Sequence, residues 1–344
     1  MRIGVIGTGK LGEFHTKLLG DIALESPDVH LCGIFDRDSQ RAEEIAGKYG
    51  VRQFDSVEQL AANCDAAVIA TTTSTHFDIA RQLLAEKKHL FIEKPITATV
   101  EEADELIRLE EENGVRIQVG HIERFNPALR AVESYIGEPM YIQAERLSGF
   151  SLRVTDVSVV LDLMIHDIDL VLSLIKSDIK SIAASGVRVF SNELDMATAR
   201  IDFMNGATAN VTASRLSRSR IRKMRFFCNE PKSYASLDLT SGKSEVFRLV
   251  HPAEASSKNP VKTYAARKIL EQFGEIKEAM QGMVLDYITP DVPKTNALRD
   301  ELRHFIDAVL NDSPVAVSSR DGRKAVMVAD RITDEIAGNA ALFD

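Results

Sequence analysis

The sequence predicts an α/β protein in which a doubly wound parallel sheet is followed by an α+β domain with a large, mostly antiparallel open sheet. Three observations lead to this fold class. Strand and helix patterns alternate over residues 1–121, as in βαβ units. After residue 122 strand patterns follow one another through tight turns. The 344 residues, 44% of them hydrophobic, suffice for two cores. We expect a first domain over 1–121 and a second over 122–344, whose C-terminal helices pack back toward the first.

The first half contains short apolar runs separated by amphipathic segments. The apolar runs predict strands at 3–7, 29–36, 65–71, 89–95 and 115–121. The intervening segments predict helices at 10–19, 39–50, 76–88 and 100–114. The second of these helices ends on Gly50, and the third carries basic residues in its last turn, both ordinary features of helix C-termini.

The stretch GTGKLG (7–12) lies where the first strand meets the first helix. Gly7 permits a tight turn, Gly9 lets the backbone approach a pyrophosphate, and Gly12 allows close helix packing. The helix N-terminus adds unpaired N–H groups and a partial positive charge. In this context the motif indicates a dinucleotide site rather than a glycine turn without a ligand. Its candidate contacts are Gly7, Gly9, Lys10, Leu11 and Gly12.

The second strand ends at Asp36, which follows Gly12 by 24 residues. A carboxylate at this point accepts hydrogen bonds from the adenosine ribose and repels a 2′-phosphate, which favours NAD over NADP. Arg37 follows directly and is able to accommodate such a phosphate, so NADP stays open as the second choice. The alternative for Asp36 is that it only starts the turn DRDS.

Composition limits the partners and the compartment. The net charge of −9 and the pI near 5.5 argue against nucleic acid or an anionic membrane as a partner. No apolar run is long enough to span a bilayer, and the N-terminus lacks the pattern of a signal peptide. Three scattered cysteines without CxxC spacing favour reduced thiols. We therefore expect a cytoplasmic protein.

One segment opposes the acidic balance. Residues 214–226 (SRLSRSRIRKMRF) carry five arginines and a lysine. They are either the solvated face of a strand and its turn, or a local site for an anionic ligand.

The segment 159–172 (VVLDLMIHDIDLVL) places acids and an imidazole in an apolar run. As a helix it would carry Asp162, His166 and Asp169 on one face at i, i+4 and i+7. The stripe beside that face, which would pack inward, is Leu161, Ile165, Ile168 and Leu172. Such a face suits the wall of a cleft, although acids that face water with a locally satisfied His166 would give the same pattern. A single imidazole is weak evidence for a metal site, and we expect no metal here.

The pattern of the second half predicts a sheet with helices around it. Strand patterns occupy 140–150, 179–190, 196–217, 223–229 and 233–239, and Asn205–Gly206 marks a hairpin within the third of them. Helices are expected at 295–312 and 321–338. The stretch 251–294 is less regular and suggests an insertion.

Five stretches together resemble the Gfo/Idh/MocA oxidoreductases: GTGKLG, ATTTSTHFDIA (70–80), EKP (93–95), GHIERFNP (120–127) and DLMIHDIDL (162–170). The resemblance covers nearly the whole chain. It implies a Rossmann domain that binds NAD, followed by a substrate domain. It further implies oxidation of a sugar or cyclitol hydroxyl by hydride transfer, and a homodimer or homotetramer that forms through the C-terminal sheet.

The resemblance also assigns roles to residues of this chain. Lys94, Asp162 and His166 are the expected catalytic set, with Lys94 beside the nicotinamide ribose and His166 as the best general base. Besides the glycine motif, Asp36 and Arg37, the expected cofactor contacts are Thr71, Thr72, His76, Glu93, Lys94 and Pro95. The expected substrate contacts are Lys94, Arg124, Asn126, Arg153, Asp162, His166, Arg215 and Arg222.

Within the family, DVSVVLDLMIHDIDL and GHIERFNPAL most resemble a subgroup that oxidises the 3-hydroxyl of UDP-N-acetylglucosamine. The arginines of 214–226 would then bind its diphosphate, since the planar guanidinium binds two oxygens at once. Another sugar or inositol dehydrogenase of the same family is the alternative. A non-catalytic NAD-binding regulator is a further one, against which the presence of Lys94, Asp162 and His166 together argues.

Overall fold

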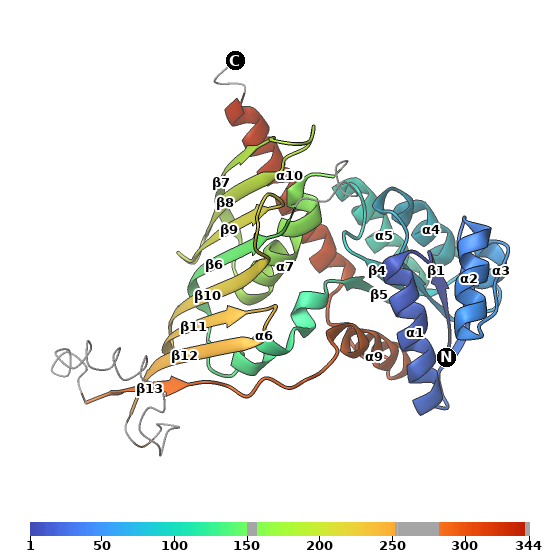
Figure 1. Ribbon diagram of the computed structural model, residues 1–344, viewed down its shortest axis with the longest axis horizontal. Helices are drawn as coiled ribbons and strands as arrows, with labels where there is room; N and C mark the ends of the chain where they lie inside the picture. The colour runs from blue at the N-terminus through green and yellow to red at the C-terminus, as the bar shows by residue number, and fades with distance from the viewer. Residues whose placement is uncertain (150–156, 252, 254–281, 341–344) are drawn as a thin grey trace. The chain divides into compact units, whose positions relative to one another are not determined.

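A computed structural model describes residues 1–149, 157–251, 253 and 282–340 (Figure 1). The chain divides into two compact units. The first comprises Met1–Phe125 with Asn296–Asp330, and the second comprises Asn126–Thr295 with Arg331–Asp344. This division differs from two continuous domains, because a late segment of the chain returns to the first unit.

The first unit contains a five-stranded parallel sheet in the order β2-β1-β3-β4-β5. Its strands are β1 (Arg2–Ile6), β2 (His30–Phe35), β3 (Ala66–Ile69), β4 (His89–Glu93) and β5 (Ile117–Gly120). Its helices are α1 (Lys10–Glu25), α2 (Ser39–Tyr49), α3 (Val57–Ala61), α4 (Thr73–Ala85), α5 (Val100–Asn113), the 3₁₀ turn η1 (Ile122–Phe125) and α9 (Ala297–Leu310). Helix α10 (Ser319–Ala340) contributes its first half to this unit. The predicted parallel sheet is confirmed.

The strand order of this sheet reverses between β1 and β3. Gln53 makes an isolated parallel bridge to Ile34 of β2, which extends the order by one short segment beyond β2. In open parallel sheets the crevice at such a reversal, outside the carboxyl ends of the strands, is where ligands bind. The loops that follow β1 and β3 are therefore the candidates for binding a cofactor.

Helix α9 explains why residues 296–330 belong to the first unit. Its Leu302, Phe305 and Ile306 are buried in the same core as Ile3 and Phe91 of the parallel sheet. Phe91 and Phe305 stack edge to face with 6.0 Å between ring centroids. The helix thus buries its apolar stripe against the sheet, as the sequence pattern of 295–312 requires of some partner.

The second unit is built on an eight-stranded sheet in the order β13-β12-β11-β10-β6-β9-β8-β7. The strands are β6 (Pro139–Leu147), β7 (Ile179–Val187), β8 (Met196–Phe203), β9 (Thr208–Ser214), β10 (Ile221–Asn229), β11 (Lys232–Asp238), β12 (Lys243–Val250) and β13 (Val284–Ile288). All neighbours are antiparallel except β6 and β9. The mostly antiparallel sheet and the hairpin at Asn205–Gly206 are confirmed. Strand β13 falls inside the stretch that we expected to be an insertion, most of which lies outside the described residues.

The two faces of this sheet differ. Helices α6 (Pro127–Val132) and α7 (Ile165–Leu174) cover one face, where side chains such as Ile142, Met224 and Phe226 are buried (Figure 1). On the other face five aromatic residues form a cross-strand row from β6 to β13: Tyr141, Phe227, Tyr234, Phe247 and Tyr287. The members of this aromatic row are only partly buried, and Phe227 is 43% exposed.

The polar segment of the sequence is helical, but its first turn is not an α-helix. Val160–Met164 form a π-helix that runs into α7. The wider π turn changes the angular spacing between Asp162 and the residues after it. Asp162 and His166 are half-buried, whereas Asp169, about one α-helical turn after His166, is 1% exposed. The expectation that Asp169 shares their open face is wrong.

No helix among the described residues has the length and apolar character that crossing a bilayer requires.

Candidate functional site

The predicted cofactor residues follow the carboxyl ends of four parallel strands. Gly7 follows β1, Asp36 follows β2, Thr71 comes soon after β3, and Lys94 follows β4. Since the strands are parallel, these loops all lie at one edge of the sheet. The structure therefore brings them together at the edge where nucleotides bind in this class of fold.

The glycine loop has the shape that a pyrophosphate needs. Gly7 has a φ of +90°, and a Cβ there would lie 2.6 Å from the carbonyl oxygen of Ala70. A Cβ on Gly12 would lie 1.8 Å from the carbonyl oxygen of Gly7. Gly9, by contrast, faces open space and caps α1 without any side-chain hydrogen bond to the first turn. The first-turn N–H groups are thus left for a ligand, which fits a bound dinucleotide.

Asp36 organises this loop. Its Oδ2 accepts hydrogen bonds from the backbone N–H of Thr8 (2.5 Å) and from Thr8 Oγ1 (2.9 Å), while Oδ1 accepts from the N–H of Asp38 (2.9 Å). Arg37 is exposed. A carboxylate has about four lone-pair sites, so these bonds leave Asp36 able to accept from a ribose as well. Asp36 does more than start a turn.

His76 connects two of the edge loops. Its Nδ1 lies 2.9 Å from the carbonyl oxygen of Pro95, and its Nε2 lies 3.3 Å from that of Thr71. Burial lowers the pKa of His76 and outweighs the bonds to Pro95 and Thr71, which raise it. The neutral ring carries one proton, and the shorter bond assigns it to Nδ1. His76 therefore holds the loops in place. Of the two threonines predicted as cofactor contacts, Thr71 is half-buried and Thr72 is exposed.

A buried pair supports the EKP motif, and the sequence reasoning missed half of it. His15 Nε2 of α1 lies 2.7 Å from Glu93 Oε1, and His15 is fully buried. The backbone N–H of Lys94 donates to Glu93 Oε2 (3.3 Å), and the Lys94–Pro95 peptide bond is cis. Burial raises the pKa of Glu93, but the bond and charge of His15 and the charge of Lys94 outweigh it and hold the pKa below its usual value. The available signal was a histidine three residues after Gly12 on the inner face of the helix.

Arg124 and Asn126 have structural partners within their own units. Arg124 Nη1 donates to the carbonyl oxygen of Ala316 (3.4 Å), and Nη2 lies 3.8 Å from Asp321 Oδ1. Asn126 Oδ1 caps α6 by accepting from the N–H of Ala128 (3.0 Å). Both residues remain candidates for the substrate, and the predicted Arg153 lies outside the described residues.

In the second unit the π-helix places Asp162 one turn before His166 on α7. π-Helical turns inside α-helices are frequent at functional sites. The N–H of Asp162 donates to the carbonyl oxygen of Ser158 (3.0 Å), which anchors the turn. A half-buried carboxylate and imidazole on one helix suit the binding and deprotonation of a hydroxyl group.

A buried ion pair fixes α7 to the sheet. Arg146 of β6 donates from Nε and Nη2 to the two carboxylate oxygens of Asp167, at 2.8 and 2.9 Å. Both side chains are almost fully buried. Asp167 follows His166 directly, so this pair restrains the backbone that carries the imidazole. No sequence motif predicts the pair of Arg146 with Asp167.

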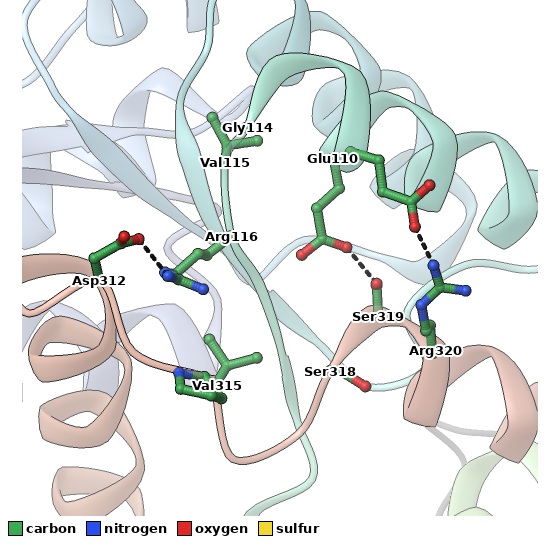
Figure 2. A pocket seen from close by; sticks show the side chains of 11 residues that line it. Glu110, Gly114, Val115, Arg116, Asp312, Val315, Ser318, Ser319 and Arg320 are labelled. Atoms are coloured by element: carbon green, nitrogen blue, oxygen red, sulfur yellow. Dashed lines mark hydrogen bonds and ion pairs between the residues drawn. The ribbon is translucent and has the colours of Figure 1, made fainter.

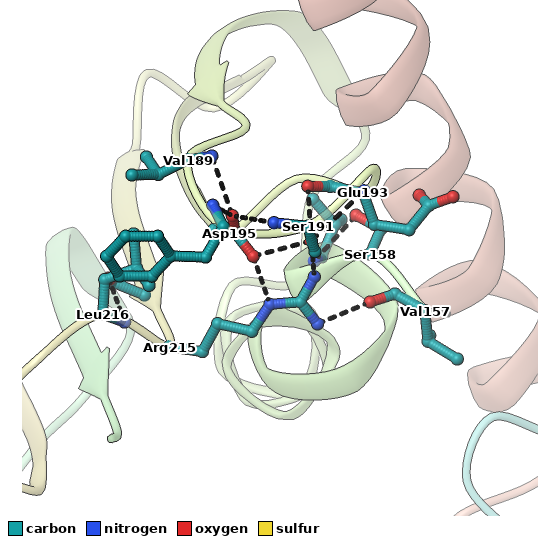
Figure 3. Close-up of polar contacts among 11 residues, drawn as sticks. Val157, Ser158, Val189, Ser191, Glu193, Asp195, Arg215 and Leu216 are labelled. Atoms are coloured by element: carbon teal, nitrogen blue, oxygen red, sulfur yellow. Dashed lines mark hydrogen bonds and ion pairs between the residues drawn. The ribbon is translucent and has the colours of Figure 1, made fainter. Parts of the chain in front are cut away.

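A second buried pair corrects our expectation for Arg215 (Figure 3). Arg215 is 3% exposed, and its Nε donates to Asp195 Oδ1 at 2.8 Å. Nη1 donates to the carbonyl oxygen of Val157 (2.8 Å), and Nη2 donates to Ser191 Oγ (2.9 Å). A guanidinium whose nitrogens already bind protein atoms in a dry site is not a ligand for a diphosphate. Arg215 is therefore withdrawn from the substrate contacts.

Arg222 has a different environment. It lies in β10 directly opposite Arg146 of β6, half-buried, on the sheet face that α7 covers. Among the arginines of 214–226 that we expected at the substrate, Arg222 remains.

The first unit also has a pocket of about 440 Å³ that does not lie at the loops after β1 to β4 (Figure 2). Its lining includes Gly114–Arg116, which come just before β5, so it opens at the amino end of that strand. Ion pairs join Arg116 to Asp312 and Arg320 to Glu111, and burial raises the pKa of Glu110. This pocket lies at the edge of the parallel sheet where the amino ends of the strands meet, opposite the loops that follow β1 to β4. It is therefore not a cofactor crevice. The described residues contain no cluster of metal-ligating side chains.

The chain was compared with known proteins. Residues 1–121 match the model of an oxidoreductase family with an NAD-binding Rossmann fold, and residues 129–231 match a GFO/IDH/MocA C-terminal domain. The UDP-N-acetylglucosamine 3-dehydrogenase of Acidithiobacillus ferrooxidans is 35% identical over 330 residues, 96% of this chain and 95% of that protein. Its solved structure is similar with a TM-score of 0.83, at 34% identity over 98% of this chain and 97% of that one. The scyllo-inositol 2-dehydrogenase (NAD(+)) of Bacillus subtilis is 31% identical over 63% of this chain and 68% of that protein.

Proposed function

Since the chain belongs to the Gfo/Idh/MocA oxidoreductase family, we propose that it oxidises the 3-hydroxyl of UDP-N-acetylglucosamine with NAD⁺. The observation that carries the proposal is the likeness to a dehydrogenase of that substrate over 96% of the chain. The residues of both units that the family uses in hydride transfer are present, namely Lys94, Asp162 and His166.

The proposed reaction divides its work among these three side chains. The glycine loop and the EKP turn would hold the cofactor, whose oxidised nicotinamide would supply the acceptor for the hydride of the carbinol carbon. His166 takes the hydroxyl proton as the general base, and the C–O bond becomes a ketone. Asp162 orients the imidazole or holds the neighbouring hydroxyl. Lys94 would lie beside the nicotinamide ribose of the bound cofactor, and Glu93 and His15 fix its backbone.

We propose NAD rather than NADP as the cofactor because of Asp36. Its carboxylate is fixed by Thr8 and Asp38 at the end of β2, where a 2′-phosphate would meet its negative charge. The exposed Arg37 is the residue that would favour NADP. The ratio of kcat/KM for the two cofactors decides between them.

The diphosphate of a nucleotide sugar needs cationic contacts on a protein of net charge −9. With Arg215 engaged by Asp195, Arg222 is the arginine of that segment that we propose for the diphosphate. Replacing Arg222 with alanine should raise KM for the nucleotide sugar more than it lowers kcat, because uniform binding is lost.

The decisive experiment is a turnover assay with NAD⁺ and a panel of substrates: UDP-N-acetylglucosamine, UDP-glucose, free N-acetylglucosamine and inositols. A nucleophile that traps ketones should be present, because an accumulating 3-keto sugar would drive the reaction backwards. We expect reduction of NAD⁺ with UDP-N-acetylglucosamine and little with the free sugar. Rapid oxidation of inositol, without response to any UDP-sugar, would instead support the second candidate, which the inositol dehydrogenase relative favours.

We further propose a cytoplasmic homo-oligomer that forms through the aromatic row of the second unit. Cys32, Cys64 and Cys228 are free thiols, which suits a reducing compartment. A half-exposed row of five aromatic side chains suits burial against a second copy. Phe227→Glu should lower the sedimentation coefficient of the oligomer, whereas Leu24→Glu, at an 89% exposed position of the first unit, should not. Equal behaviour of the two variants would place the interface elsewhere.

A further inference from the structure

The loop between β7 and β8 is folded around one buried carboxylate. Asp195 is fully buried, and its Oδ2 accepts from the backbone N–H groups of Val189 (2.8 Å), Phe190 (2.7 Å) and Ser191 (3.1 Å). Its Oδ1 accepts from Ser191 Oγ (2.8 Å) and from Arg215 Nε (2.8 Å). Burial raises the pKa of Asp195, but the bonds from Phe190, Val189, Arg215 and Ser191 outweigh it and hold the pKa well below its usual value. The carboxylate stays ionised at neutral pH and keeps the loop closed.

Sheet register places this carboxylate opposite Arg215. Met196 of β8 pairs with Ser214 of β9, so Asp195 and Arg215 are the next residues along the two strands. The backbone N–H of Arg215 also donates to the carbonyl oxygen of Asp195 (3.0 Å). The guanidinium then leaves the sheet and reaches a third segment, the residues that precede the π-helix (Figure 3).

Two bonds hold that third segment. Arg215 Nη1 donates to the carbonyl oxygen of Val157, and the N–H of Val159 donates to the carbonyl oxygen of Leu194 in the loop (3.0 Å). Between them, Ser158 accepts from Val160 and from Asp162, the first through its Oγ (3.2 Å) and the second through its carbonyl oxygen (3.0 Å). The chain of bonds thus runs from Asp195 through Arg215 to the turn that carries Asp162.

We propose that Asp195 and Arg215 are positioning residues for the catalytic helix: they set where the π-helix begins and hence where Asp162 and His166 stand. The two residues bind neither substrate nor cofactor in this role. Arginine is required because its three nitrogens donate in three directions, to Asp195, Val157 and Ser191. The proposal rests on the proposed function for its kinetic consequence.

The test compares two conservative variants, Arg215→Lys and Arg248→Lys. A lysine at 215 keeps a positive charge near Asp195, but its single ammonium cannot reproduce the forked geometry. Arg248 is the matched control. It makes a similar pair with Asp286 (3.0 Å) at the other end of the same sheet, where β10 and β11 separate β12 from β6. Ser191→Ala is a milder third variant, which removes one partner of both Asp195 and Arg215.

Two measurements are made on the full-length protein. The first is backbone amide exchange over residues 157–166, which reads the helix start without any substrate. The second is kcat and KM with NAD⁺ and UDP-N-acetylglucosamine. For Arg215→Lys we expect faster exchange in that stretch and a kcat lowered by about ten- to a hundredfold, the scale of a small misplacement of catalytic groups. KM for NAD⁺ should stay within about twofold, and Ser191→Ala should show the same changes to a smaller degree.

The outcomes separate the possibilities. Unchanged exchange and kcat in Arg215→Lys, or equal losses in Arg215→Lys and Arg248→Lys, would overturn the positioning role, because a general loss of stability would then suffice. A large rise in KM for the nucleotide sugar at constant kcat would overturn it too, by returning Arg215 to substrate binding. If Arg215→Lys does not fold, Ser191→Ala decides by the same criteria. A wild-type protein that oxidises no nucleotide sugar refutes the proposed function, and amide exchange then decides the positioning role alone.

Discussion

The two units hold their candidate functional residues in different ways. In the first unit most of them lie on turns after parallel strands, and their places follow from backbone geometry such as the positive φ of Gly7. In the second unit Asp162 and His166 lie on a helix whose position depends on buried arginine–aspartate pairs from distant parts of the chain. A turn motif is visible in a few consecutive letters, whereas such pairs join residues about 20 positions apart.

This difference has a consequence for substitutions. On a backbone turn, a substitution disturbs the structure mainly when it adds a Cβ to a glycine that has no room for one. Many neighbouring side chains can be exchanged without this effect. Around a buried ion pair, loss of one partner leaves a charge in a dry site, which is far more costly than loss of a surface pair. An exception in the first unit is the buried pair of His15 with Glu93.

The largest effect should come from that exception. Replacing His15 with leucine would leave the Glu93 carboxylate buried without its imidazole partner. We expect the free energy of unfolding to fall by roughly 3–5 kcal/mol, the scale for a broken buried pair. Urea unfolding followed by circular dichroism measures it. Arg108→Ala is the surface control, since its partners Glu105 and Glu112 lie in solvent, and it should lower the free energy of unfolding far less. Equal losses in both variants would mean that the first unit has no such dependence.

The next largest effect should be on kcat, and two variants test whether each unit supplies a group that takes part in the reaction. Lys94→Ala and His166→Ala should each lower kcat by about a hundredfold or more, the usual scale for lost acid–base work. Binding of NAD⁺, measured by calorimetry, should persist in His166→Ala, because the glycine loop is untouched. Near-full turnover in both variants would mean that neither side chain carries the acid–base work, whereas a wild-type protein without turnover on any substrate would favour the regulator interpretation.

A smaller effect separates ligand contact from folding at the glycine loop. Gly9 has space for a Cβ and a negative φ of −59°, so Gly9→Ala should fold normally. The added methyl would stand where the backbone approaches the pyrophosphate, and we expect the Kd for NAD⁺ to rise about tenfold, or 1.4 kcal/mol. Gly47→Ala in α2 is the control, with equally open space. It should leave the Kd unchanged and stabilise the protein by about 0.5–1 kcal/mol. Unaltered affinity in Gly9→Ala would move the pyrophosphate away from this loop.

The smallest effect is a dependence of stability on pH. The pKa of buried His76 is lowered, so the contribution of its neutral ring is complete above the unfolded pKa of about 6.5. That contribution is lost as the pH falls through the folded pKa, with a slope of at most about 1.4 kcal/mol per pH unit. His76→Asn keeps a donor for Pro95 but does not titrate. Its stability relative to the wild type should therefore improve between pH 7 and pH 5 in thermal unfolding. A difference that is constant with pH would show that His76 does not titrate on unfolding.

The sequence by itself determined the fold class, the cofactor motif and the family. These rest on local patterns: the alternation of strands and helices, the glycines of GTGKLG, the EKP turn, and the Asn205–Gly206 hairpin. Each is specified by neighbouring residues, because turns and amphipathic periods are set within about ten positions. The sequence also predicted a helix over 159–172, and its acids and imidazole among apolar residues make that helix a candidate for function.

Only the tertiary structure decided what the buried charges do. The sequence places Arg215 in a basic run that we expected to be exposed. In the structure, sheet register places Arg215 opposite Asp195, and the guanidinium is buried. The fold likewise pairs Arg146 with Asp167 and buries Asp169, which the helical pattern had placed on one face with Asp162 and His166. A charge pattern cannot distinguish a solvated arginine from a buried one, because the difference lies in a partner far away in the chain. That partner becomes a neighbour only when the sheet has formed.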